Sequence, residues 1–177
     1  MTKEYFFETE RLAVRKFEPG DRDRLYAIHR DDEVKKWIPG EYYEDLDEAQ
    51  KGIEFFAECV ENKELPYVLA VVLKETGELI GDTGVNEVEG KPGEVEIGFV
   101  IGRDYRGNGY ATEVLKHMGD YILSIASGIK VLYGRVMKGN DASVRVLEKN
   151  GYVFDGEEFG AEDDPYGNGM LVYRRNV

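Results

Sequence analysis

The sequence predicts one mixed α/β sheet with helices on both of its faces, and three observations lead to this fold class. Residues 67–73 form a nearly continuous apolar run, which is typical of a strand that is covered on both sides. Residues 109–125 repeat apolar side chains at helical spacing over a long stretch. Strand and helix patterns follow one another along the chain, which predicts six to seven strands and four helices in a single domain, residues 1–177.

The N-terminal third is predicted to hold one strand and two helices. Residues 11–17 alternate apolar and polar side chains, as a half-buried strand does. Residues 18–21 break this strand with a proline and a glycine and open a helix. Asp45 and Glu48 form a capping-box-like pair at the start of a second helix, whose apolar residues continue at steps of three and four. We expect the segment between the two helices to be a loop.

The rest of the chain is predicted to alternate strands with two further helices. A Glu-Thr-Gly-Glu turn after residue 74 leads to a partner strand, and a Gly-Lys-Pro-Gly break separates that strand from the next one. The expected strands cover residues 79–88, 94–101, 130–136, 152–158 and 170–174, and the expected helices cover residues 109–125 and 141–150.

Composition and charge limit the possible partners. The chain has 177 residues and a single cysteine, Cys59, so no disulfide can form within it and a reducing, cytoplasmic location is expected. It shows neither a signal peptide nor a stretch of about 20 apolar residues, so we expect no membrane insertion. The formal net charge of -13 argues against nucleic-acid binding. The same negative charge would attract a cationic substrate. The alternative is that the acidic residues only keep a cytosolic protein soluble.

Residues 103–112, between a predicted strand and a predicted long helix, resemble a phosphate-binding loop in composition. Gly107 and Gly109 permit a tight turn in which successive N–H groups point at one spot, and the following helix N-terminus adds unpaired donors. Arg106 adds a cation, although a simple turn or helix cap is the alternative interpretation. A dinucleotide fingerprint is excluded because Thr112 replaces its third glycine, and a P-loop is excluded because Gly-Lys-Ser/Thr is absent.

Three motifs occur along the chain in an order that a known family shares. Arg106, Gly109 and Ala111 match the pattern Arg/Gln-x-x-Gly-x-Gly/Ala, and residues 140–152 match Asn-x-x-Ser followed by Glu-Lys-x-Gly-Tyr. In these motifs the chain resembles the GNAT superfamily of N-acetyltransferases over nearly its whole length. The opening residues 9–21, with Thr-Glu-Arg-Leu and Pro-Gly-Asp, are similar to the RimJ/RimL branch, which resembles enzymes that acetylate the N-termini of ribosomal proteins.

The resemblance implies acetyl-CoA as the co-substrate, bound without a metal ion. In the family, the strand before the loop splays from the next parallel strand, and its backbone bonds the pantetheine arm and the thioester oxygen. Asn140 is implied to bond the pantetheine, although asparagine is also a natural helix cap, and Ser143 is implied to lie near the sulfur. The implied cofactor-binding residues are Phe99, Val100, Ile101, Arg106, Gly107, Asn108, Gly109, Tyr110, Ala111, Thr112, Asn140 and Ser143.

Acetyl transfer to an amine requires removal of a proton, because an alkylammonium group has a pKa of about 10. Glu94 and Glu96 share one face of their strand, and Glu96 lies where many GNAT enzymes carry a glutamate that acts as general base. The alternative is that Glu96 is a solvated strand residue. Many relatives protonate the leaving thiolate with a tyrosine, but this chain has Leu147 there, which leaves Ser143, a water molecule or no group for that step.

The acceptor is expected to be a primary amine, either a protein N-terminus or a small cationic molecule. Trp37, Tyr42 and Tyr43 precede the second helix and are expected to wall its site, although aromatic loop residues also often cover a core. His29 and His117 have no metal-ligand cluster around them in the sequence, and we interpret them as surface residues. The alternative to an enzyme is a regulatory module that binds acyl-CoA without needing a base. Both a monomer and a homodimer fit the sequence.

Overall fold

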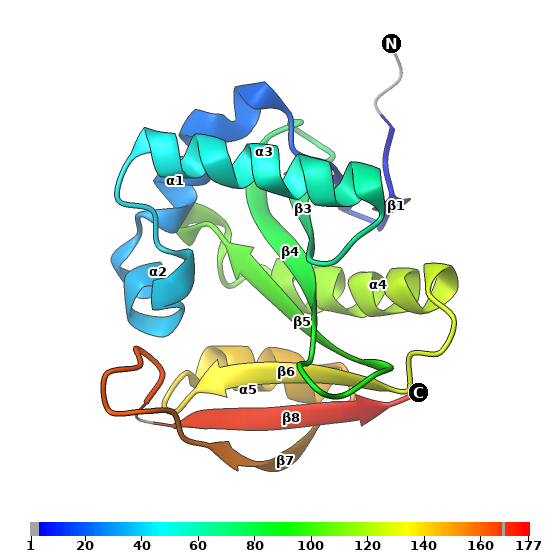
Figure 1. The fold of residues 1–177 in the computed structure, drawn as a ribbon. Helices are drawn as coiled ribbons and strands as arrows, with labels where there is room; N and C mark the ends of the chain where they lie inside the picture. The colour runs from blue at the N-terminus through cyan, green and yellow to red at the C-terminus, as the bar shows by residue number, and fades with distance from the viewer. Residues whose placement is uncertain (1–3, 168) are drawn as a thin grey trace.

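One sheet of eight strands organises the chain in the computed structural model, which describes residues 4–167 and 169–177 (Figure 1). The strands are β1 (Phe7–Glu8), β2 (Leu12–Arg15), β3 (Tyr67–Leu73), β4 (Leu79–Glu87), β5 (Glu94–Ile101), β6 (Val131–Met137), β7 (Val153–Glu158) and β8 (Met170–Asn176). Their order in the sheet is β1-β2-β3-β4-β5-β6-β8-β7. All neighbours are antiparallel except β5 and β6, which are parallel.

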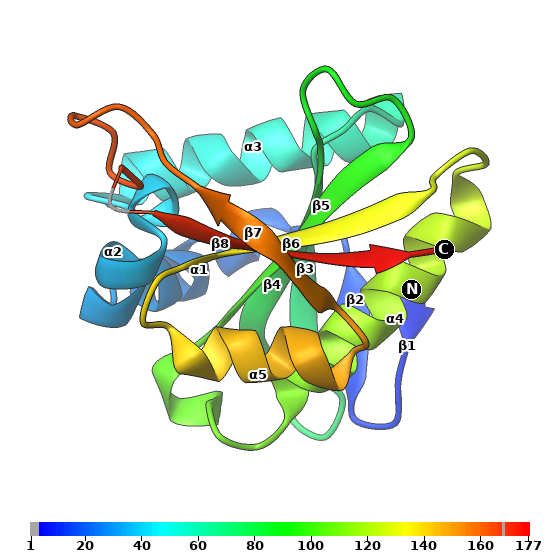
Figure 2. The same cartoon turned by 90° about the horizontal axis from the view of Figure 1, so that it is seen from below.

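Helices cover both faces of this sheet, as predicted (Figure 2). The described residues form α1 (Arg22–His29), α2 (Asp32–Trp37), α3 (Leu46–Asn62), α4 (Tyr110–Ile125) and α5 (Asp141–Lys149), with the short 3-10 turns η1 (Pro19–Asp21), η2 (Pro39–Glu41) and η3 (Arg103–Tyr105). α3 lies on one face, where it contacts α1 and β3, and α4 and α5 lie on the other. None of these helices has the length and apolar character that a membrane span needs.

β3 confirms the prediction of a strand that is covered on both sides. Leu69 and Val71 pack into the hydrophobic core with α4, whereas Ala70 and Val72 pack into a second cluster with α1 and α3. Successive side chains of a strand point to opposite faces, so this one strand contributes to both cores. All four side chains are buried, and the unbroken apolar run in the sequence follows from that position.

The structure adds two elements that the sequence did not predict. α2 occupies the segment that we expected to be a loop, and Asp31 caps it by accepting a hydrogen bond from Glu33 N at 3.0 Å. Val34 is the one buried residue of this short helix, so its sequence lacks the repeated apolar spacing that predicts longer helices. β1 is a two-residue strand at the edge of the sheet, too short to show an alternating pattern.

β5 and β6 are paired only at their N-terminal ends within the described chain. The parallel register runs from Glu94 opposite Val131 to Glu96 opposite Tyr133. Beyond these residues β5 continues its pairing with β4, and β6 continues its pairing with β8. The two strands therefore diverge (Figure 1), which confirms the splayed strands that the resemblance implied.

Candidate active site

Two cavities open where β5 and β6 diverge. The first, here called the loop cavity, has a volume of about 570 Å³ and lies between the end of β5, the 103–112 loop and the N-termini of α4 and α5. Its walls contain all the residues predicted to bind the cofactor except Asn108: Phe99, Val100, Ile101, Arg106, Gly107, Gly109, Tyr110, Ala111, Thr112, Asn140 and Ser143. The structure thus brings the loop, the strand and the second motif together around one space.

The 103–112 loop has the backbone shape that anion binding needs. Gly107 and Gly109 have φ angles of 78° and 81°, in the left-handed region that favours glycine. Gly109 is the N-cap of α4, and its carbonyl oxygen accepts a hydrogen bond from Glu113 N at 3.1 Å. The N–H groups of residues 110–112 precede that bond and have no partner within the helix. Together with the helix dipole, they form a site suited to a phosphate.

Arg11 holds this loop in place, a role that the sequence analysis missed. Its Nη1 donates to Asn108 O at 2.8 Å, its Nε donates to Glu113 Oε2 at 2.7 Å, and its guanidinium lies 4.4 Å from the centre of the Tyr110 ring. Desolvation raises the pKa of Glu113, but hydrogen bonds from Thr9 and Arg11 outweigh it and lower that pKa. The opening motif that resembles the RimJ/RimL branch therefore stabilises the 103–112 loop through the contacts of Arg11.

Arg106 lines the loop cavity but is already engaged by protein groups. Its Nε donates to Ile101 O at 2.8 Å, and its Nη2 lies 3.2 Å from Asp31 Oδ2. Asp31 also accepts a hydrogen bond from Arg103 Nη2 at 2.8 Å. A phosphate near Arg106 would therefore share the guanidinium with Asp31, which weakens the contact relative to an unpaired arginine.

Alternate residues of β5 direct their backbone groups into the gap between the strands. Gly102 N donates to Ile80 O of β4 at 2.8 Å. Backbone groups of a strand point to its two neighbours in alternation, so every second residue counted from Gly102 bonds toward β4. Val100 is one of these residues, and its backbone belongs to the sheet although the residue lines the loop cavity. Phe99 and Ile101 are the intervening residues, so their backbone groups point away from β4, into the gap between β5 and β6.

Asn140 and Ser143 stand where the loop cavity meets a second cavity. Asn140 Oδ1 accepts a hydrogen bond from Ser143 N at 3.3 Å, so Asn140 caps α5. Both residues line both cavities, as do Trp37, Ile38 and Phe99. Groups bound in the two cavities would meet at this junction.

The second cavity, here called the acidic cavity, has a volume of about 450 Å³. Its four carboxylates come from four separate segments: Glu41, Glu96, Glu158 and Asp164. Arg135 on β6 reaches two of them, with Nη1 2.7 Å from Glu96 Oε2 and Nε 2.9 Å from Glu158 Oε2. The hydrogen bond from Arg135 lowers the pKa of Glu158. Because Arg135 is the one cationic side chain among the described wall residues, the cavity carries a net negative charge.

His29 is not a surface residue, and our interpretation of it was wrong. Its side chain is 3% exposed, with Nε2 2.5 Å from Asp82 Oδ2 and Nδ1 2.6 Å from the carbonyl oxygen of Glu41. Burial by itself would lower the pKa of His29, but the Asp82 carboxylate outweighs burial and raises the pKa to about 9. His29 is therefore an imidazolium at neutral pH that donates to both neighbours. Its spacing of one helical turn from the apolar Leu25 is the sequence signal for burial.

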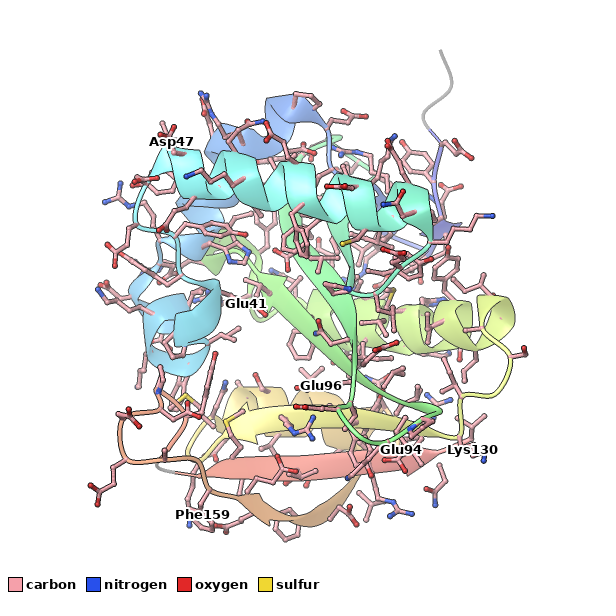
Figure 3. The ribbon with its side chains drawn as sticks, in the orientation of Figure 1. Glu41, Asp47, Glu94, Glu96, Lys130 and Phe159 are labelled. Atoms are coloured by element: carbon pink, nitrogen blue, oxygen red, sulfur yellow. The ribbon has the colours of Figure 1, made fainter. Side chains whose placement is uncertain are left out.

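Glu41 projects from η2 into the acidic cavity, where the residue is partly open to the cavity and otherwise surrounded by protein (Figure 3). Desolvation by the surrounding protein raises the pKa of Glu41 to about 7, with a further contribution from the Asp82 charge. The His29 imidazolium acts in the opposite direction but does not cancel these effects. No motif in the sequence pointed to this carboxylate.

Of the three aromatic residues predicted for the acceptor site, the structure brings Trp37 into the cavity walls. Tyr42 and Tyr43 are not among the described residues that line either cavity. Tyr43 instead packs its ring against that of His29, with the ring centres 4.9 Å apart. Tyr166, from the loop before β8, lines the acidic cavity in their place.

Leu147 occupies the position where many relatives carry a tyrosine, and it is buried against β6. A Cβ added to Gly134 would lie 2.4 Å from Leu147 Cδ2, so this contact is closely packed. Ser143 is the hydroxyl-bearing side chain among the five residues shared by both cavities. No three His, Cys, Asp or Glu side chains of the described residues are grouped as metal ligands.

Two relatives in sequence carry the name N-acetyltransferase. A family profile described as "Acetyltransferase (GNAT) domain" matches residues 11–153. The uncharacterized N-acetyltransferase YoaA of Bacillus subtilis (strain 168) is 31% identical over 149 residues, which cover 84% of this chain and 83% of that protein. The uncharacterized N-acetyltransferase p20 of Bacillus licheniformis is 29% identical over 149 residues, which cover 84% of this chain and 82% of that protein.

Solved structures share the fold over nearly the whole chain. A GNAT-family acetyltransferase from Bacillus anthracis matches with a TM-score of 0.78 and 25% identity over 96% of both chains. RimL, a ribosomal L7/L12 alpha-N-protein acetyltransferase in complex with coenzyme A, matches with a TM-score of 0.83 over 98% of both chains, and at 15% identity this likeness concerns the fold alone. With the family profile spanning the loop, the splayed strands and α5, the chain belongs to the GNAT family of acetyl-CoA-dependent acetyltransferases.

Proposed function

We propose that the protein transfers the acetyl group of acetyl-CoA directly to a positively charged primary amine within a ternary complex. The observation that carries the proposal is the junction at which the loop cavity and the acidic cavity share Trp37, Ile38, Phe99, Asn140 and Ser143. A thioester held in one cavity and an amine held in the other would meet there. Positioning two reactants in this way can remove about 7–11 kcal/mol of a reaction barrier in favourable cases.

The loop cavity offers a partner for each part of acetyl-CoA. The N–H groups of residues 110–112 bind the pyrophosphate, and the backbone of Phe99 together with the N–H of Ile101 bonds the pantetheine arm. The same gap brings the Phe99 N–H close to the thioester oxygen, where a donor stabilises the negative charge that develops during attack. Ser143 supplies a proton to the departing thiolate at the junction.

The acidic cavity selects the acceptor by charge. Four carboxylates against one arginine attract an ammonium group, and the net charge of -13 adds a longer-range attraction for cations. A small amine fits within the volume of about 450 Å³, and so does the first residue of a protein N-terminus. Glu96, which we predicted to be the general base, lines this cavity in an ion pair with Arg135.

Release of free thiol from acetyl-CoA in the presence of an amine tests the proposal. We expect turnover with a subset of a panel that contains polyamines, aminoglycosides and peptides with free N-termini, and no turnover with the same compounds after chemical N-acetylation. Saturable CoA binding measured by calorimetry, without thiol release for any amine in a broad panel, would contradict the enzyme and favour a CoA-binding regulatory module.

Arg106→Ala is expected to weaken CoA binding about tenfold, because one charged phosphate contact is lost. The effect stays moderate since Asp31 already pairs with this guanidinium. Arg103→Ala is the matched control, because Arg103 also pairs with Asp31 but is not among the described residues of the loop cavity. Calorimetric titration should give a CoA affinity for Arg103→Ala within about twofold of the parent. An equal loss of CoA affinity in both variants would show that Arg106 does not contact the phosphate.

A further inference from the structure

Two carboxylates reach the acidic cavity from opposite sides, Glu96 from β5 and Glu41 from η2 (Figure 3). We infer that Glu41 is the catalytic base that takes the proton from the acceptor amine, while Glu96 binds and orients the ammonium group. The inference rests on the proposed function, and it assigns to a residue outside the recognised motifs the step that we had predicted for Glu96.

The first argument is that the two carboxylates differ in how free they are to pair with an incoming ammonium group. Glu96 Oε2 lies 2.7 Å from Arg135 Nη1, so one oxygen of this carboxylate is already engaged in an ion pair. The Glu41 carboxylate has no hydrogen bond or ion pair with another described side chain. An incoming ammonium group can therefore pair with Glu41 without displacing an arginine.

The second argument is the electrostatic surroundings. A general base works best when its pKa lies near the working pH, and the raised pKa of Glu41 brings it there. The charged and titratable groups that act on Glu41 or share its cavity are His29 of α1, Tyr43, Asp82 of β4, Glu96 of β5, Arg135 of β6, Glu158 of β7, and Asp164 and Tyr166 of the loop before β8. Negative groups outnumber positive ones in this set, which favours uptake of a proton.

The third argument is that the backbone of Glu41 is held on both sides. The carbonyl oxygen of Glu41 accepts the hydrogen bond from buried His29, and Glu41 N donates to Ile38 O at 2.8 Å. The preceding residue is fixed as well, since Gly40 N donates to Tyr166 Oη at 3.1 Å. These backbone bonds fix the point from which the side chain extends, so η2 holds Glu41 at the wall of the cavity.

The proton and electron pairs balance without any further reactant. The bound ammonium gives one proton to the Glu41 carboxylate and becomes a neutral amine. The nitrogen lone pair forms the C–N bond to the thioester carbon, and the C–S bond then breaks with its electron pair on sulfur. The nitrogen loses its second proton as the thiolate gains one through Ser143, and Glu41 later releases its proton to water.

Glu41→Gln tests the inference, because it keeps the shape of the side chain and removes the proton acceptor. We expect kcat to fall by about 10²–10⁴-fold with CoA affinity unchanged. The parent enzyme should show kcat/KM rising with pH through an inflection near 7, the range in which Glu41 loses its proton, to a plateau above it. In Glu41→Gln this inflection should disappear, and kcat/KM should rise continuously toward the pKa of the free amine, about 10.

Three further variants separate the base from a structural role. Glu44→Gln alters an exposed glutamate three residues away that is not among the described residues of either cavity, and it should leave both rate and pH profile unchanged. Glu41→Asp should keep the inflection at a reduced rate. Glu96→Gln should raise KM for the amine and also keep the inflection. Loss of the inflection in Glu96→Gln with its retention in Glu41→Gln would overturn the inference alone, whereas a parent enzyme inactive toward every amine would overturn the proposed function as well.

Discussion

Gly109→Val is expected to weaken CoA binding by about 10²-fold or more, equivalent to about 3 kcal/mol, in a protein that still folds. Gly109 has a φ of 81°, and a β-branched side chain is strongly disfavoured there. A Cβ at this position would lie 3.5 Å from Arg11 Nη2, an ordinary contact, so the strain comes from the backbone and not from crowding. Relief of that strain rotates the peptide units whose N–H groups would bind the pyrophosphate. Calorimetric titration with CoA at fixed salt measures the loss.

Gly77→Val is the matched control for this experiment. Gly77 has a φ of 73° with open space around it, and it lies in the turn between β3 and β4, away from both cavities. The control should suffer a comparable loss of stability, because its backbone strain is similar, and should keep the CoA affinity of the parent. An unchanged CoA affinity in Gly109→Val would place the pyrophosphate elsewhere.

Asp82→Asn is expected to remove about 3 kcal/mol of folding stability at pH 6.5, because it leaves the buried imidazolium of His29 without its counter-charge. The asparagine keeps the size of the side chain, so the loss reports on charge and not on a cavity. Denaturant unfolding of both proteins across a pH series measures the difference. Asp47→Asn, at an exposed position of α3, should change stability by no more than about 0.5 kcal/mol.

The same pair predicts a pH dependence with a definite sign. The pKa of His29 is about 9 in the folded chain and 6.5 in an unperturbed one, so folding takes up a proton between these values. The stabilisation is fully present below pH 6.5 and is lost as the pH rises through 9. The stability difference between the parent and Asp82→Asn should therefore shrink as the pH rises from 6.5 to above 9. A difference that stays constant over this range would show that His29 is neutral in the folded protein.

The loop cavity could be predicted from the sequence because the residues that shape it are close together in the chain. Gly107 and Gly109 stand between a strand and a helix, and the tight turn they permit leads directly into the helix start, whose N–H groups share a direction. The sheet was predictable for a similar reason, since apolar periodicity is a local property of each segment. α2 was not predicted because it has a single buried apolar residue, Val34, and a side-chain cap, so its sequence shows no repeated apolar spacing.

The acidic cavity could not be predicted in the same way. Glu41, Glu96 and Glu158 are far apart in the sequence, and they meet because β5 and β6 separate after three paired residues and η2 folds over the opening. The pairing of Glu96 with Arg135 depends on the register of two parallel strands, which no single-segment pattern specifies. The burial of His29 likewise depends on Asp82, which reaches it from a strand 53 residues later.

The contacts of Arg11 couple the N-terminal strand to the loop and helix that follow β5. The arginine lies 97 residues before Asn108 in the chain, so its hydrogen bond ties the 103–112 loop to the N-terminal strand. Any ligand that selects the ordered loop must then also favour the docked strand, by thermodynamic reciprocity. Fraying of the N-terminal segment would accordingly reduce the affinity for the ligand in an otherwise folded molecule. Conversely, a bound ligand would slow proteolytic cleavage at the start of the chain.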